Sequence, residues 1–143
     1  MPIALKRVYE KPASADGTRI LVDRLWPRGL TKQSAAVDGW LRDLAPSHQL
    51  RKWFHANPDH WSAFRSRYLK ELTGAEASKA LEELYQLGHK GKLTLLFASK
   101  NEERNNATVL RDLLEGARKP PTGTGPAVAR AARMRNARPA PRR

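Results

Sequence analysis

Three short apolar stretches of the chain have the pattern of buried β-strands. In residues 3–9, Ile3, Leu5 and Arg7 alternate with Ala4, Lys6 and Val8. Residues 18–25 and 92–98 instead contain continuous apolar runs. A continuous run is typical of a parallel strand that is covered on both faces, and Pro27 and Gly29 end the second stretch. Residues 37–45 fit either a strand or a helical turn.

Apolar positions at spacings of three and four residues predict helices between and after these strands. The first helix begins at Ser47 as N-cap, and the second at Asn57 with Pro58 at its first position. Gly88 is the predicted end of the third helix, and Asn101, followed by an acidic turn, the start of the last. In chain order, the apolar faces of the four predicted helices consist of Leu50, Trp53 and Phe54; Trp61, Phe64, Tyr68 and Leu72; Ala77, Ala80, Leu81, Leu84 and Leu87; and Val109, Leu110, Leu113, Leu114 and Ala117.

Strands that are separated by helices predict an α/β fold with a parallel sheet. A chain of 143 residues has room for one such domain. We therefore expect a single-domain three-layer sandwich with a mainly parallel sheet, and we place the domain at residues 1–118.

The composition changes after this domain. Residues 119–143 contain five of the ten prolines, and their only large apolar side chains are Val128 and Met134. Such a segment buries too little apolar surface to offset the entropy of ordering, so we expect a disordered C-terminal tail.

The tail also carries most of the excess positive charge. The chain has 27 Lys and Arg against 14 Asp and Glu, a formal net charge of +13. Eight of the basic residues and no acidic one follow Ala117, which leaves 27 − 8 = 19 basic against 14 acidic residues, a net of +5, before it. The tail is therefore a candidate for non-specific nucleic-acid binding through phosphate contacts.

Several classes of protein are excluded or disfavoured. The chain has no cysteine, which rules out disulfides and thiolate metal sites, and it has no apolar run long enough for a membrane helix. No pair among His48, His55 and His60 has the helical spacing of metal ligands, so we expect no metal site. We expect a cytoplasmic protein with no membrane partner; its cofactors and oligomeric state stay open.

The candidate site lies where two predicted strands end. In sheets whose strands are connected by helices, ligands bind beyond the carboxyl ends of the strands. Residues 23–29 and 99–101 lie at the carboxyl ends of two of the predicted strands. Guanidinium and ammonium groups beside a helix N-terminus suit phosphate or carboxylate oxygens. We therefore predict an anionic small-molecule ligand, with Asp23 and Lys100 as candidate catalytic residues and Arg24, Trp26, Arg28 and Asn101 as candidate ligand-binding residues.

Each candidate also has a structural interpretation. Asp23 can equally form a buried ion pair with an arginine and fix the loop. Trp26 is more often a core or lid aromatic than a stacking platform, Lys100 can be a solvated surface lysine, and Asn101 is favoured as a helix cap. Basic residues also interleave with aromatic residues along residues 51–68, a pattern better explained by a core stripe than by nucleic-acid stacking.

Several separated motifs together resemble the YeaO-like family of small bacterial proteins, a domain of unknown function. The resemblance covers roughly residues 3–115 and implies a compact α/β domain of the bacterial cytoplasm with no established activity. It adds Arg51 and Asn105 to the candidate ligand-binding residues, whereas the arginine-rich tail is not part of the family pattern. The motifs are LVDRLWPRG (21–29), APS (45–47) with LRK (50–52), WxxFRxxY (61–68) with EL (71–72), and LTLLFASKN (93–101) with Asn105, Ala107, Val109 and Leu110.

Three functions follow from these patterns. The first is an enzyme or binding domain for a phosphorylated or nucleotide-like small molecule, in which Arg24, Arg28 and Lys100 hold the anion and Asp23 orients an arginine or acts as general base. The second is a nucleic-acid-associated protein that uses a basic face and the tail. The third is a non-catalytic interaction domain.

Overall fold

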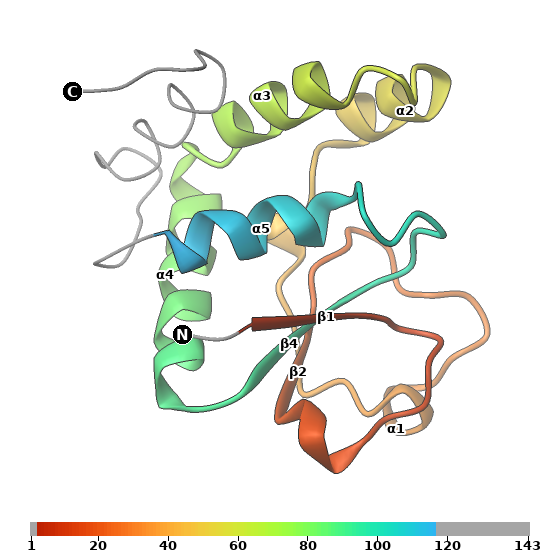
Figure 1. Cartoon of the computed structure of the whole chain (residues 1–143), viewed down its shortest axis with the longest axis vertical. Helices are drawn as coiled ribbons and strands as arrows, with labels where there is room; N and C mark the ends of the chain where they lie inside the picture. The colour runs from red at the N-terminus through yellow and green to blue at the C-terminus, as the bar shows by residue number, and fades with distance from the viewer. Residues whose placement is uncertain (1–2, 117–143) are drawn as a thin grey trace.

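The computed structural model describes residues 3–116, and a four-stranded parallel sheet lies at the centre of this part of the chain (Figure 1). The spatial order of the strands is β1-β4-β2-β3. All three predicted strands are confirmed, each somewhat shorter than predicted. The strands are β1 (Ile3–Arg7), β2 (Thr18–Leu21), β3 (Gly39–Trp40) and β4 (Leu93–Phe97).

Strand β4 lies between β1 and β2 and is buried along its whole length. Leu93 pairs with Ile3 of β1 on one side and with Thr18 of β2 on the other, and both pairings are parallel. All five residues of β4 are buried, which explains the continuous apolar run in the sequence. The prediction that residues 18–25 and 92–98 contain parallel strands of one sheet is therefore confirmed.

Five α-helices and two short 3-10 helices connect and follow these strands within residues 3–116. Side chains at the predicted spacings form the buried faces of the longer helices. The helices are α1 (Lys32–Ala35), α2 (His48–Ala56), α3 (Trp61–Glu71), α4 (Ala75–Lys90) and α5 (Asn106–Glu115), and the 3-10 helices are η1 (Ser14–Asp16) and η2 (Arg42–Leu44).

Two clusters of buried side chains pack against the two faces of the sheet. The larger cluster joins Ile20 and Leu95 to the apolar faces of α2, α3, α4 and α5. The smaller cluster joins Leu21 and Leu96 to Ala35 of α1 and to loop residues. Adjacent strand residues belong to different clusters because side chains alternate across a sheet. The α/β class with a parallel sheet is confirmed, and the third layer consists of α1 and its flanking loops.

The ambiguous segment 37–45 contains both of the alternatives that the sequence left open. Its first half contributes the two-residue edge strand β3, and its second half forms the 3-10 helix η2. Val37 belongs to the smaller cluster and Leu44 to the larger one, so the segment crosses from one face of the sheet to the other.

The predicted start of the second helix is wrong. Ser47 does cap α2, since its side chain accepts a hydrogen bond from the Leu50 N–H. Asn57, however, follows the end of α2, where its side-chain amide donates to the Trp53 carbonyl at 2.9 Å. Helix α3 begins three residues later than predicted, at Trp61 with His60 as N-cap.

Two other predicted helix boundaries are also wrong. Helix α4 continues through the buried Gly88 and ends at Lys90, because burial of this turn outweighs the modest helix propensity penalty of one glycine. Asn101 caps a turn rather than a helix: its Oδ1 accepts from the Glu103 and Arg104 N–H groups at 3.0 and 2.9 Å. The N-cap of α5 is Asn105, whose Oδ1 accepts from the Thr108 N–H at 3.0 Å.

The predicted tail, residues 119–143, lies outside the described residues, as does the predicted domain boundary at residue 118. Within residues 3–116, none of the helices combines the length and the apolar character needed to cross a membrane.

Candidate functional site

Asp23 is the carboxylate at the carboxyl edge of the sheet, and neutral donors occupy both of its oxygens. Its Oδ2 accepts from the Ala98 N–H after β4 at 2.9 Å, and its Oδ1 accepts from Nδ2 of Asn106 in the first turn of α5 at 3.0 Å. Its carbonyl accepts from Nε1 of Trp40 at 2.7 Å. Asp23 therefore ties the ends of β2, β4 and β3 to α5, and it makes no ion pair with any described residue.

The electrostatic environment of Asp23 combines opposing effects. Burial of the carboxylate raises its pKa, while the hydrogen bonds from Ala98 and Asn106 and the positive charge of Arg51 lower it. Burial dominates, so the pKa of Asp23 lies above its usual value. The effect of Arg51 also shows that α2 places a cation near this carboxylate.

Arg24 connects the same edge to the segment that precedes α2. Its Nε donates to the Pro46 carbonyl and its Nη2 to the Ala45 carbonyl, both at 3.2 Å. These bonds position the chain immediately before Ser47, the N-cap of α2. Two of the guanidinium donors that sequence reasoning assigned to an anion are thus used within the protein.

A chain of contacts brings the loops after β1, β2 and β4 together. Arg7, the last residue of β1, donates to the Ser99 carbonyl at 3.0 Å and to the Ala98 carbonyl at 3.1 Å. Its guanidinium lies 5.4 Å from the ring centre of Tyr9, and the Tyr9 hydroxyl donates to the Arg28 carbonyl at 3.1 Å. Residues 28 and 99, which sequence reasoning placed at one edge, are therefore linked through β1.

Arg28, Arg51 and Lys100 are exposed at this edge. None of the three forms an ion pair with another residue in the range 3–116. They differ in this respect from Arg7 and Arg24, whose guanidinium groups are bound to backbone carbonyls. Among the candidate site residues, these three are the cations whose side chains form no hydrogen bond or ion pair with the described residues.

The remaining candidates have positions that stabilise the loops. Trp26 packs in the smaller cluster, with its ring centre 5.4 Å from that of Trp40 and its Nε1 donating to the Leu30 carbonyl at 2.6 Å. This position fits the core role that sequence reasoning ranked above a stacking platform. Nδ2 of Asn105 donates to the Asn101 carbonyl at 2.8 Å, so these two residues hold the loop that leads into α5.

Sequence reasoning missed Arg7 and Asn106. Arg7 gave a weak signal, since it is a cation near the end of the strand predicted at residues 3–9. Asn106 gave none, because its role depends on the first turn of α5 lying over the end of β2, where its Nδ2 also donates to the Val22 carbonyl at 2.9 Å. The sequence predicted the start of this helix at Asn101, whereas α5 begins at Asn106.

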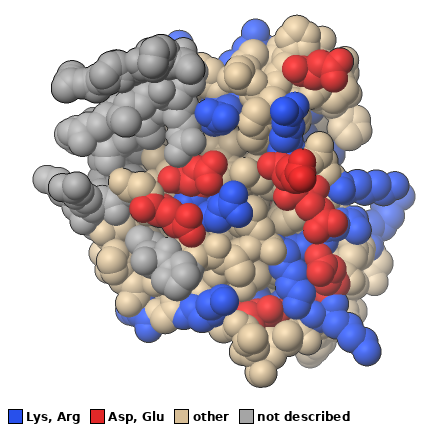
Figure 2. All heavy atoms as spheres, in the orientation of Figure 1, with Lys and Arg blue, Asp and Glu red and all other residues tan. Residues whose placement is uncertain are grey.

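The surface beside this edge carries charges of both signs. Figure 2 shows acidic and basic side chains interleaved over the visible face, with several lysines and arginines at the right margin, toward which β1 runs in Figure 1. On this face the basic groups do not form one uninterrupted surface. Within residues 3–116, no three His, Asp or Glu side chains are grouped so that they could hold a metal ion.

Comparison with known proteins identifies the family. Residues 2–128 match the model of DUF488-N3i, whose description is "Inactive DUF488-N3 subclade". The chain belongs to this family. It is also 45% identical to the uncharacterized protein YeaO of Escherichia coli over 114 residues, which are 80% of this chain and 97% of YeaO.

Mycobacterial relatives give the same result. The chain is 41% identical over 114 residues to the uncharacterized proteins Mb3100c of Mycobacterium bovis and Rv3073c of Mycobacterium tuberculosis, and the match covers 80% of this chain and 94% of each relative. The YeaO-like resemblance inferred from the motifs is thus confirmed. No solved structure matches the chain.

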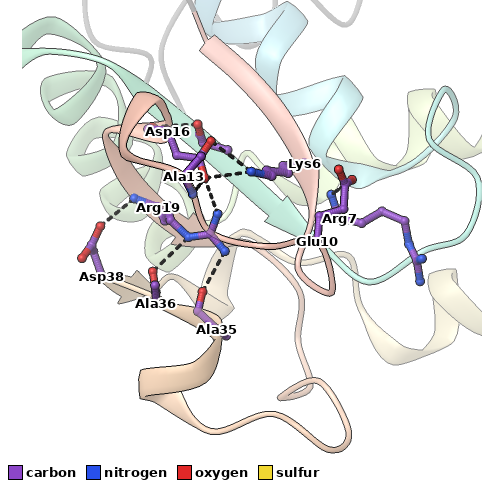
Figure 3. Close-up of polar contacts among 10 residues, drawn as sticks. Lys6, Arg7, Glu10, Ala13, Asp16, Arg19, Ala35, Ala36 and Asp38 are labelled. Atoms are coloured by element: carbon purple, nitrogen blue, oxygen red, sulfur yellow. Dashed lines mark hydrogen bonds and ion pairs between the residues drawn. The ribbon is translucent and has the colours of Figure 1, made fainter.

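The DUF488-N3i domain also contains a buried ionic cluster that the sequence did not reveal, at the amino end of β2 (Figure 3). The Asp16 carboxylate lies 2.6 Å from Nη1 of Arg19 and 3.1 Å from Nζ of Lys6. The Arg19 guanidinium also donates to the Ala35 carbonyl at 2.7 Å and to the Ala36 carbonyl at 3.0 Å. Because these donors are satisfied within the protein, we assign the cluster a structural role.

This cluster predicts acid sensitivity. Burial acts to raise the pKa of Asp16, but the hydrogen bonds from Ala13, Lys6 and Arg19 outweigh it and lower the pKa below the usual value of 3.8. Stability from this carboxylate is therefore present above that value and is lost as the pH falls through the folded-state pKa. The difference in unfolding free energy between the wild type and Asp16→Asn should be largest near neutral pH and should shrink below pH 3.8. Urea denaturation at several pH values measures it, and an equal difference throughout would contradict the prediction.

Proposed function

We propose that this domain binds a small phosphorylated or nucleotide-like anion at the carboxyl edge of the sheet, without chemical turnover. The observation that carries the proposal is the contrast between two kinds of charge at this edge. Arg28, Arg51 and Lys100 are exposed and have no ion-pair partner among residues 3–116, whereas both oxygens of Asp23 already accept hydrogen bonds.

The chemistry of these cations favours oxyanions. Guanidinium groups offer planar pairs of N–H donors that match phosphate and carboxylate oxygens, and an ammonium group adds a compact charge. The contacts from Arg7 to Ser99 and from Tyr9 to Arg28 hold the two loops that carry Arg28 and Lys100 next to each other. Pre-positioned loops lower the entropic cost of binding.

The same geometry argues for binding rather than catalysis. A general base needs a carboxylate oxygen that can reach the proton of a substrate. The oxygens of Asp23 instead accept hydrogen bonds from Ala98 and Asn106, and both bonds would have to be given up for the carboxylate to reach a substrate proton. The description of the family as an inactive subclade is consistent with this distribution of roles.

Thermal denaturation with added ligands tests the proposal. Inorganic phosphate, ribose 5-phosphate and adenosine diphosphate are the probes, and uncharged ribose and adenosine are their matched controls. A binding ligand at 100 times its Kd should stabilise the fold by about 2.7 kcal/mol, which raises the melting temperature by several degrees. The uncharged controls should leave it unchanged.

Alanine variants locate the site. Arg28→Ala and Lys100→Ala should each weaken the binding of the best probe about tenfold or more, because each removes a charge-assisted hydrogen bond. Lys92→Ala is the matched control, since Lys92 is an exposed lysine before β4, at the opposite edge of the sheet. Equal losses in all three variants, or no stabilisation by any charged probe, would refute the proposal.

A further inference from the structure

Helices α2 and α3 form an antiparallel hairpin at one end of the molecule, at the top of the view in Figure 1. Its open end is fixed by Ser47, whose N–H and Oγ both donate to the Glu71 carboxylate, at 2.8 and 2.6 Å. At its closed end, Asn57 caps α2 by donating to the Trp53 carbonyl, and its own carbonyl accepts from the His60 N–H across the turn at 3.0 Å. The hairpin is therefore held in one geometry by bonds at both ends.

The outer surface of this hairpin is basic. Lys52, Arg67 and Lys70 are exposed and make no ion pair with any residue of the described range. Of the two acidic residues in the hairpin, Glu71 is used by Ser47, which leaves Asp59 in the turn. Unpaired cations on a fixed helical surface complement a polyanion.

An aromatic ring lies within this basic surface. The Arg67 guanidinium stands 4.0 Å from the ring centre of Trp53, and the His60 ring packs edge-on against the same indole at 5.9 Å. Trp53 is half-buried, so the core holds its ring while one part stays accessible. The indole in turn orients the guanidinium, which gives a flat cationic surface of fixed orientation.

We propose that the α2–α3 hairpin binds single-stranded nucleic acid, with Lys52, Arg67 and Lys70 contacting phosphates and the Arg67–Trp53 pair stacking on a base. Flat guanidinium and aromatic surfaces stack on the faces of unpaired bases, which a duplex hides. This surface differs from the anion site at the carboxyl edge, to which α2 contributes Arg51, because its ligand is an extended strand with unpaired bases. The core interpretation of Trp53 holds as well, since the ring contacts both the core and Arg67.

Fluorescence anisotropy with the full chain and a labelled oligothymidylate tests this proposal. The double variant Lys52→Glu/Arg67→Glu should weaken binding about tenfold or more at physiological salt and make the salt dependence less steep, because two phosphate contacts are lost. The control Lys79→Glu/Lys90→Glu changes two exposed lysines of α4 and alters the net charge equally. This control should change the affinity less than about twofold, because its two lysines do not belong to the proposed binding surface. Any attraction of the oligonucleotide by the basic tail is the same in both double variants and cancels in the comparison.

Two further comparisons separate stacking from simple charge attraction. An abasic strand with the same number of phosphates should bind about fivefold more weakly or worse, as should a duplex of the same length. Arg67→Lys keeps the charge but loses the planar group, so it should reduce the preference for the strand with bases while leaving the melting temperature unchanged. Four results would each overturn the proposal. They are equal loss of affinity in the two charge-reversing double variants, equal binding of the abasic strand and the strand with bases, tighter binding of the duplex than of the single strand, and no binding by the full chain.

Discussion

Replacement of Arg19 by methionine should lower the free energy of unfolding by about 3–5 kcal/mol, because it removes one partner of a buried ion pair. Arg19 is only 3% exposed, and its guanidinium satisfies Asp16 and the Ala35 and Ala36 carbonyls. Methionine keeps the apolar stem of the side chain, so the loss comes from the missing donors rather than from a cavity. The buried Ala35 carbonyl and the part-buried Ala36 carbonyl would also lose these donors, which adds to the cost.

Chemical denaturation of Arg19→Met and of Arg104→Met measures this difference. Arg104 is exposed and its side chain forms no hydrogen bond, ion pair or ring contact with the described residues, so its substitution should change stability by less than about 0.5 kcal/mol. The Arg19 variant should also loosen the segment around α1, which hydrogen exchange would detect at Ala35 and Val37. If both variants were equally stable, Arg19 would not hold α1 to the sheet.

Arg19 also marks how far the sequence predicts this fold. The parallel sheet was predictable because residues 18–25 and 92–98 are apolar runs separated by helical patterns. The burial of a guanidinium inside one of those runs was not, since its partners come from η1 and α1, which carry no periodic signal. The spacing of apolar residues along a strand or helix predicts which of its faces is buried, but it does not predict which other segments pack against that face.

The predicted starts of two helices were wrong for a related reason. Asn57 and Asn101 are both good capping residues, and both do bind backbone groups, but they bind the end of α2 and a turn rather than a helix start. Short polar side chains stabilise several local geometries with similar energy. The observed starts of α3 and α5 agree with the packing of Trp61 and Ala107 against the core, and at α5 also with the cap that Asn105 supplies.

At the candidate site, the sequence predicted the proximity of two segments but not the contacts between them. Parallel strands β2 and β4 must end at the same edge, which brings Asp23 and Lys100 to one region. The sequence suggested an arginine as the partner of Asp23. It could not show that the Asp23 carboxylate instead accepts hydrogen bonds from Asn106 and Ala98. A candidate site can thus be located from topology, whereas the role of each side chain depends on tertiary contacts.

Asp23→Asn should lower the free energy of unfolding by about 1–3 kcal/mol, the cost of leaving one buried hydrogen-bonding group unsatisfied. The carboxylate accepts from both Ala98 and Asn106, whereas an asparagine side chain has one oxygen and must turn its NH2 group toward a donor. Asp43→Asn, at an exposed position in η2, is the control and should have little effect.

The pH dependence of this difference identifies the cause of the raised pKa of Asp23. Burial makes the folded-state pKa higher than the usual 3.8, so the native state binds more protons than the unfolded state between the two values. The stability contributed by protonation is therefore full below pH 3.8 and is lost as the pH rises through the folded-state pKa. Asparagine does not titrate, so the gap between the wild type and Asp23→Asn should be widest at acid pH and narrow toward neutrality, opposite to the trend for Asp16→Asn. Denaturation curves of the three proteins across this range measure both trends. A gap that instead widened with rising pH would mean that hydrogen bonds and Arg51 dominate over burial at Asp23.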